Sequence, residues 1–206
     1  MQYTYNTAIS LLSEFLGFPE KQIIDLCKNG DKLYNETWKK MSPQNEEQRN
    51  SFYSMDAQIF GQIQWHFKTR EGFKRRQNLS NLLSGKVLDY GCGIATQDIW
   101  AAQNNNVDID LYDLPGKTKN FVSFVISRLE LRNIRYIDSI TSDRTYNIVV
   151  CTDVLEHLED PCLALQDIKD SLKSTGTLLY RAPTDEKNPS LSHIQNGKNP
   201  EDWIKK

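Results

Sequence analysis

The stretch from residue 86 to residue 97, KVLDYGCGIATQ, constrains the fold more than any other part of the chain. Its first five residues form a short, mostly apolar run that is typical of a buried parallel strand. Gly91 and Gly93 follow at once, and Ile94 begins a helical pattern. Glycines at such a turn let the backbone bend sharply and lie against a ligand that a Cβ atom would push away. The stretch therefore predicts the nucleotide-binding strand–turn–helix unit of an open α/β sheet.

Strand and helix patterns alternate from residue 86 onward, which is typical of a parallel sheet covered by helices on both faces. The alternation predicts a Rossmann-like, doubly wound α/β fold with a mainly parallel sheet. We expect Gly176 to follow the last helix as its C-terminal cap. The expected strands are residues 86–90, 107–112, 134–138, 146–151 and 177–182, and the expected helices are residues 95–104, 116–131 and 161–173.

Residues 1–84 contain helical patterns only. In the longest of these, apolar residues from Phe52 to Phe67 fall on one stripe, and we expect Gly72 to end that helix. We therefore divide the chain into an N-terminal helical cap, residues 1–84, and a Rossmann-like domain, residues 85–206.

The composition argues against several classes of protein. A net charge of −2 gives no indication of nucleic acid or a membrane surface as a partner. No apolar stretch is long enough to span a membrane, and the N-terminus lacks the basic start of a signal peptide. The four cysteines are scattered, as is typical of reduced thiols, so we expect a cytoplasmic protein.

An acid at the end of the second strand should lie beside the glycine turn. A carboxylate there can accept hydrogen bonds from both hydroxyls of a ribose. Asp113 is the last acid before Leu114 and Pro115, and it is our choice, with Asp110 as the alternative. The competing structural interpretation is that Asp113 caps the helix that Pro115 opens.

The fourth strand and its continuation, YNIVVCTDVLEHLEDP (residues 146–161), carry the most specific motif. Together with Asp89-x-Gly91-x-Gly93-x-Ala95, it resembles motifs I and IV of the class I S-adenosylmethionine (SAM)-dependent methyltransferases. The resemblance covers residues 86–183 and is closest to the ubiquinone-pathway O-methyltransferase branch. The tetrapeptide (Asn/Asp)-Pro-Pro-(Phe/Tyr), typical of DNA-adenine and glutamine methyltransferases, is absent after this strand, which argues against those substrates.

The resemblance implies SAM as the cofactor and transfer of its methyl group to a small-molecule acceptor, most simply to oxygen. It implies that Leu114 packs on the adenine and that a polar residue past the third strand, Asp138 or Ser139, contacts the adenine edge. His157 is our candidate catalytic residue, as a general base, with a purely structural role as the alternative. The expected cofactor-binding residues are Asp89, Gly91, Gly93, Asp113, Leu114, Asp138 and Thr152.

Asp153, Glu156 and His157 lie at spacings that place them on one side of a helical turn. This arrangement resembles the metal site of the small-RNA 3′-end 2′-O-methyltransferases, in which a later histidine, here His193, completes the ligand set. The Glu-His pair also recurs in relatives for which no metal is implied, so we expect no metal. The basic run from Lys68 to Arg76 is expected to be a solvated helix face.

The chain offers few residues for the strands that usually end this family's sheet. The sequence after Pro183 is polar and shows no strand pattern, so we expect five strands in the order 3-2-1-4-5 without the final hairpin. The fifth strand would then be an edge, covered by the C-terminal tail, a second copy of the chain or a partner protein. Two other functions stay open: a metal-assisted RNA 2′-O-methyltransferase, and a non-catalytic protein of this fold that binds a partner.

Overall fold

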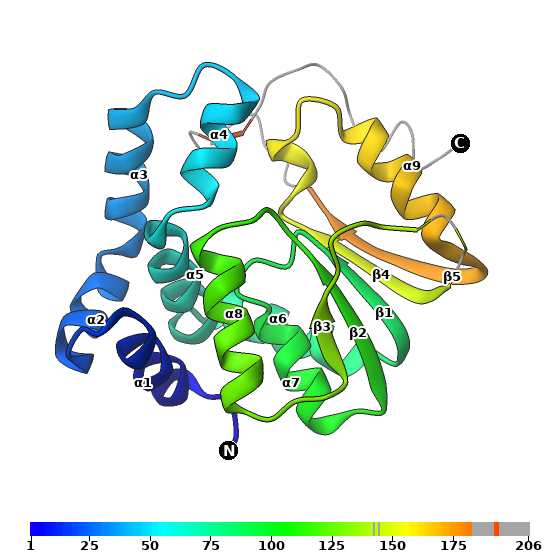
Figure 1. Ribbon diagram of the computed structural model, residues 1–206, viewed down its shortest axis with the longest axis horizontal. Coiled ribbons are helices and arrows are strands. Elements are labelled where there is room, and N and C mark those ends of the chain that lie inside the picture. Colours follow the sequence, from blue (N-terminus) through cyan, green and yellow to red (C-terminus); the bar gives the residue numbers. More distant parts are fainter. Residues whose placement is uncertain (142, 144, 183–191, 194–206) are drawn as a thin grey trace.

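A computed structural model describes residues 1–141, 143, 145–182 and 192–193. Its described residues form one five-stranded sheet, in which all strands are parallel and the order is β3-β2-β1-β4-β5 (Figure 1). This confirms the predicted Rossmann-like topology. The strands are β1 (Gly85–Tyr90), β2 (Val107–Tyr112), β3 (Ile134–Tyr136), β4 (Tyr146–Thr152) and β5 (Leu172–Arg181).

Alternating residues of the central strand β1 serve two hydrophobic cores. Val87 and Leu88 are both fully buried, but they belong to different clusters on opposite faces of the sheet. The first face packs against the cap and against α7 (Thr96–Asn104) and α8 (Lys117–Arg128). The second face packs against α9 (Pro161–Ser171) and the short 3₁₀ helix η1 (Leu155–His157).

The cap is joined to the sheet by one continuous core. Leu12, Ile59 and Ile63 of the cap lie in the same buried cluster as Val87 and Phe121 of the sheet layer. Figure 1 shows the first five cap helices gathered on one side of the sheet, at the left of the view. The cap helices are α1 (Tyr5–Leu16), α2 (Glu20–Lys28), α3 (Gly30–Met41), α4 (Glu46–Tyr53), α5 (Asp56–Lys68) and α6 (Arg70–Leu82).

The long helix that we predicted from Phe52 to Gly72 is wrong. Met55 and Thr69 have extended backbones, which divide this region into α4, α5 and α6. Thr69 ends one helix and caps the next, because its hydroxyl accepts a hydrogen bond from the Gly72 backbone N–H. Gly72 does not end a helix: it permits close packing, since a Cβ atom there would lie 2.2 Å from the Trp65 carbonyl oxygen.

The boundaries of the last helix and strand also differ from the prediction. The strand β5 begins at Leu172, so Gly176 lies inside a strand and not at a helix end. The pairing of β4 with β5 shifts register between Tyr146 and Ile148, which accommodates the early start. Within the described residues, this strand is an edge of the sheet. The predicted absence of a final hairpin concerns residues that lie outside the described part of the chain. Among the described residues, no helix has the length and apolar character that a membrane span needs.

Candidate cofactor and acceptor site

The glycine turn after β1 is built so that only glycine fits. Gly91 and Gly93 both adopt left-handed backbone angles, with φ of 75° and 55°. A Cβ atom at Gly91 would lie 2.4 Å from Val154 Cγ2, and one at Gly93 would lie 2.5 Å from Gln62 Oε1. The turn leads directly into the N-terminus of α7, where unpaired backbone N–H groups favour a negatively charged ligand group.

Asp113 lies against this turn. Its Oδ2 accepts a hydrogen bond from Gly93 N at 2.7 Å, and its Oδ1 accepts one from Leu114 N at 2.7 Å. Burial raises the pKa of the carboxyl, and these two hydrogen bonds lower it again. The helix-capping alternative is wrong, because the N-cap position of α8 is Gly116.

Asp110, the alternative acid, is engaged on the sheet. Its Oδ2 accepts a hydrogen bond from the Tyr146 hydroxyl at 2.9 Å, and its Oδ1 lies 2.7 Å from Arg135 Nη2. Neither partner belongs to the glycine turn, so the structure brings Asp113 and not Asp110 to the candidate site.

Two cavities adjoin the carboxyl ends of the strands. The first, of about 440 Å³, extends from the glycine turn to the end of β4 and under the cap. The second, of about 360 Å³, lies at the end of β4 and reaches His193. Four residues line both cavities, which makes them two parts of one cleft: Tyr34, Trp65, Asp153 and His157.

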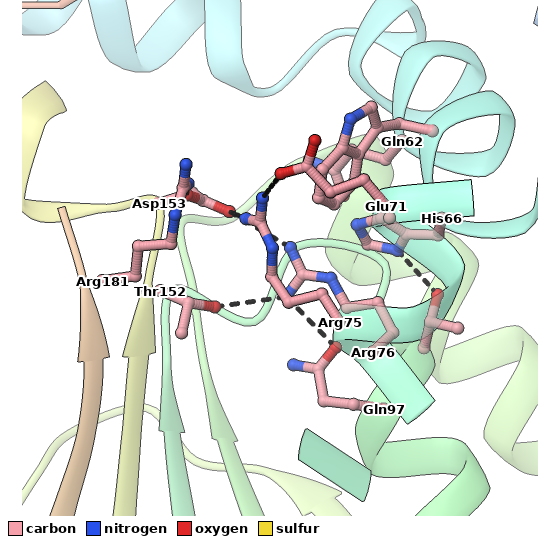
Figure 2. A network of polar contacts seen from close by, with 12 residues as sticks. Gln62, His66, Glu71, Arg75, Arg76, Gln97, Thr152, Asp153 and Arg181 are labelled. Atoms are coloured by element: carbon pink, nitrogen blue, oxygen red, sulfur yellow. Dashed lines mark hydrogen bonds and ion pairs between the residues drawn. The ribbon is translucent and has the colours of Figure 1, made fainter. Parts of the chain in front are cut away.

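A buried arginine of the cap crosses the floor of this cleft (Figure 2). Arg76 is only 6% exposed, and its Nη1 donates to Thr152 Oγ1 at 3.2 Å and to Gln97 Oε1 at 3.4 Å. Its Nη2 lies 3.3 Å from Asp153 Oδ2. Burial lowers the pKa of the guanidinium and the neighbouring carboxylates raise it, so the group remains a cation.

Asp89 supports the glycine turn from below. It is buried, accepts a hydrogen bond from Gln97 Nε2 at 2.5 Å, and does not line either cavity. It lies beside Asp98, which is also fully buried. Burial raises the pKa of Asp89 to about 6, and burial beside Asp89 raises that of Asp98 well above its ordinary value. Two buried carboxyls in contact cannot both be ionised, so Asp98 is the neutral partner.

His157 lines the same cleft, in η1. Its Nδ1 lies 3.0 Å from the Tyr53 hydroxyl and 3.1 Å from the Ser192 carbonyl oxygen. Burial is the main cause that lowers its pKa, to about 4, so the ring is neutral near pH 7. These contacts with Nδ1 leave Nε2 as the nitrogen available for chemistry.

Three of the four metal-ligand candidates come together. Ligand atoms of Glu156, His157 and His193 lie within 4.8 Å of one another. Burial raises the pKa of Glu156 to about 8. Asp153 is engaged elsewhere: its Oδ2 lies 2.9 Å from Arg75 Nη1, and its Oδ1 forms an ion pair with Arg181.

The basic run is not the uniform solvated face that we predicted. Lys68, Arg70 and Lys74 are exposed, but Arg75 and Arg76 turn inward to Asp153 (Figure 2). The Arg75 guanidinium also lies 4.4 Å from the centroid of the Trp65 ring.

Other lining residues carried no signal in the sequence. Gln62 belongs to no sequence motif, yet its Oε1 accepts a hydrogen bond from Ile94 N at 2.9 Å. Asp31 and Tyr34 reach the same cleft from α3. All three belong to the cap, so only tertiary packing brings them to the glycine turn.

The predicted adenine-contacting acid is not brought to the cleft. The Asp138 side chain is 99% exposed and forms an ion pair with Lys119 at 3.2 Å. Ser139 is exposed as well. Leu114 follows Asp113 and is 38% exposed, so its apolar side chain is open to a ligand packing against it.

The family of the chain follows from a comparison with family models. Residues 64–204, which include the glycine turn, Asp113 and the end of β4, match the model of a methyltransferase domain. The chain belongs to this methyltransferase family. The ubiquinone-pathway branch is not distinguished by this match, and neither the RNA-directed nor the non-catalytic alternative is favoured by it.

The chain is also similar to several solved structures. Coclaurine N-methyltransferase bound to N-methylheliamine and SAH is 15% identical, with a TM-score of 0.49 over 85% of this chain and 57% of that one. A Trypanosoma brucei PRMT1 enzyme–prozyme complex with AdoHcy is 20% identical, with a TM-score of 0.46 over 58% and 40%. YcgJ from Bacillus subtilis is 18% identical, with a TM-score of 0.47 over 55% and 53%. The chain thus spans about half the length of these proteins, and no curated protein matches it.

Membership in the family identifies SAM as the cofactor, and the residues present fit it. A glycine turn without Cβ atoms, a buried acid beside it and an exposed leucine after that acid suit the amino-acid, ribose and adenine parts of SAM. The neutral imidazole on the facing wall suits an acceptor molecule.

Proposed function

We propose that this methyltransferase transfers the methyl group of SAM to an oxygen atom of a small molecule. The observation that carries the proposal is the pairing of two walls across one cleft: the glycine turn on one side and His157 on the other. A net charge of −2 and the limited volume of the cleft, about 440 Å³ in its larger part, favour a small acceptor over a nucleic acid.

On the donor side, we propose that the backbone at Gly91 and Gly93 lies along the cofactor and that Asp113 binds the ribose. Asp113 already accepts two backbone hydrogen bonds, which fix its carboxylate before a ligand arrives. The Leu114 side chain would pack against the adenine. Thr152 ends β4 beside Arg76, and a cation there suits the carboxylate of the amino-acid part.

SAM, when bound, supplies a methyl group on a positively charged sulfur, and that sulfur keeps the bonding electron pair as the methyl group leaves. The chain's own part is mostly to hold the acceptor oxygen in line with that bond. We propose that His157 is the catalytic residue, because Nε2 of its neutral ring offers a lone pair at the acceptor wall. The acceptor oxygen keeps the new methyl group and gives up its proton toward His157.

We also propose a cytoplasmic location. The four cysteines are all free thiols, and three of them are buried, which fits a reducing environment. The edge strand β5 is a candidate surface for a second copy of the chain or a partner protein, as predicted.

Labelled methyl transfer from SAM into a small-molecule extract tests the proposed function. We expect the label in a low-mass product that gains one CH₂ unit, and its methyl signal in nuclear magnetic resonance should be that of an O-methyl group. An RNase-treated extract should be equally active. Label found only on macromolecules, or an N-methyl product, would contradict the proposal.

A further inference from the structure

We propose that Glu156, His157 and His193 bind one divalent cation, most suitably Zn²⁺, at the acceptor end of the cleft. This replaces our expectation from the sequence that no metal is bound. Binding of the ion itself does not rest on the proposed function. Only the use of the ion in methyl transfer does.

The first argument is geometric. Zinc binds imidazole nitrogens and carboxylate oxygens at about 2.0–2.2 Å in a tetrahedron, so two of its ligand atoms lie about 3.4 Å apart. The ligand atoms of the three residues already lie within 4.8 Å of one another. The rings of His157 and His193 have centroids 5.2 Å apart. Small side-chain rotations would therefore close the site without backbone movement.

The second argument comes from the Glu156 carboxylate. Both of its oxygens are buried, and neither accepts a hydrogen bond from another residue in the described part of the chain. A buried polar group without a partner is costly, and a cation would remove that cost. Asp153, its neighbour, shows the contrast: it is paired with Arg75, Arg76 and Arg181.

The third argument comes from the outer contacts of His157. Metal-bound histidines commonly donate their second ring N–H to a carbonyl or carboxylate, which fixes the ring. When Nδ1 carries the proton, it donates to the Ser192 carbonyl oxygen at 3.1 Å, beside the Tyr53 hydroxyl. This leaves Nε2 as the ligand. Ser192 precedes His193 in the chain. These two residues therefore supply one proposed ligand, His193, and the carbonyl oxygen that fixes the ring of another, His157.

The ligand set suggests what the ion does. Two histidines, one carboxylate and an open position are typical of catalytic zinc sites. An acceptor hydroxyl bound at that position would lose its proton to solvent more readily, because the cation stabilises the resulting anion. Nε2 of His157 would then be a ligand and not the base, so the ion would take over the activation of the acceptor hydroxyl, in the part of the cleft where the two cavities meet.

The test is metal binding by the full chain, measured by calorimetry with Zn²⁺ and by visible absorption of Co²⁺. We expect one ion per wild-type chain and at least a tenfold loss of affinity in Glu156→Gln and in His193→Ala. The matched control is Glu71→Gln, because Glu71 lines the same cavity but is largely exposed and paired with Arg75. That variant should bind the ion like the wild type.

SAH affinity, measured on the same samples, separates this inference from the proposed function and reports that the variants are folded. Absence of ion binding by a wild-type chain that binds SAH would overturn the inference. Unchanged ion affinity in both ligand variants would overturn it as well. Methyl transfer that survives EDTA undiminished would overturn the catalytic use of the ion.

Discussion

The donor wall and the acceptor wall of the cleft are built in different ways. The donor wall centres on one short turn, residues 91–93, to which Asp113 at the end of the adjacent strand is hydrogen-bonded. The acceptor wall gathers residues from α3, α4, α5, α6, the end of β4 and the segment at residues 192–193. Cofactor binding thus depends on local backbone geometry, while acceptor binding depends on how distant segments pack.

The largest expected effect comes from a variant that changes the acceptor wall alone. His157→Ala should lower turnover by about 10²- to 10⁴-fold, because the acceptor oxygen loses the group that helps remove its proton. SAH affinity should stay within about twofold, since the donor wall is untouched. Steady-state kinetics and calorimetry on one preparation measure both. Turnover near the wild-type value would leave His157 with a structural role only.

The next largest effect comes from a variant that changes the donor wall. Asp113→Ala should weaken SAH binding by about 1.5–3 kcal/mol, because hydrogen bonds to a charged group are lost. The matched control is Asp110→Asn, since Asp110 is a buried acid of the same strand region that pairs with Tyr146 and Arg135. We expect its SAH affinity to be unchanged. Equal losses in the two variants would show that the effect is one of folding.

A glycine pair sharpens the same point. Gly93→Ala should weaken SAH binding by about tenfold, or about 1.4 kcal/mol, because its Cβ atom would stand where the proposed cofactor lies against the turn. Gly17→Ala is the control: Gly17 has a similar φ of 72°, but nothing lies within 4 Å of its Cβ position. Both variants should lose about 1–2 kcal/mol of stability through left-handed strain. If calorimetry finds SAH affinity lowered equally in both, strain and not the cofactor contact is responsible.

The smallest effect concerns the support beneath the donor wall. The pKa of Asp98 is raised in the folded state, so folding keeps its proton, and stability declines as pH rises above the ordinary pKa of an unfolded aspartate. Asp98→Asn removes this decline. The difference in unfolding free energy between this variant and the wild type should rise in favour of the variant, by on the order of 1 kcal/mol, from pH 4 to pH 8. Urea titrations at several pH values measure this difference. A difference that does not grow with pH would show that Asp98 is ionised in the fold.

The sequence predicted the sheet well and the cap less well, for a physical reason. Central strands such as β1 are buried on both faces, so they stand out as apolar runs between glycines. Helix breaks at Met55 and Thr69 depend on extended backbone angles that no proline or glycine imposes, so the periodic apolar stripe hid them.

The same contrast holds within the site. Asp113 could be named from its place at a strand end, and His157 from the motif that follows β4. Arg76 could not, because its meaning lies in contacts with Thr152 and Asp153, which are more than seventy positions away. Asp138 as an adenine contact stays a prediction: β3 ends at Tyr136, and beyond it the Asp138 side chain is exposed and paired with Lys119.

Gln62 has a consequence for the rate at which the cofactor is exchanged. Its amide oxygen occupies the backbone N–H of Ile94 and lies over Gly93, at the end of α7 where a ligand's anionic group would bind. A cofactor whose carboxylate binds at this N–H would therefore have to displace the Gln62 amide oxygen from it. The Gln62 amide oxygen can bind the Ile94 N–H again as the spent cofactor departs. This would ease product release, a step that limits many enzymes. A residue of the cap that touches no reacting atom would thus take part in cofactor exchange.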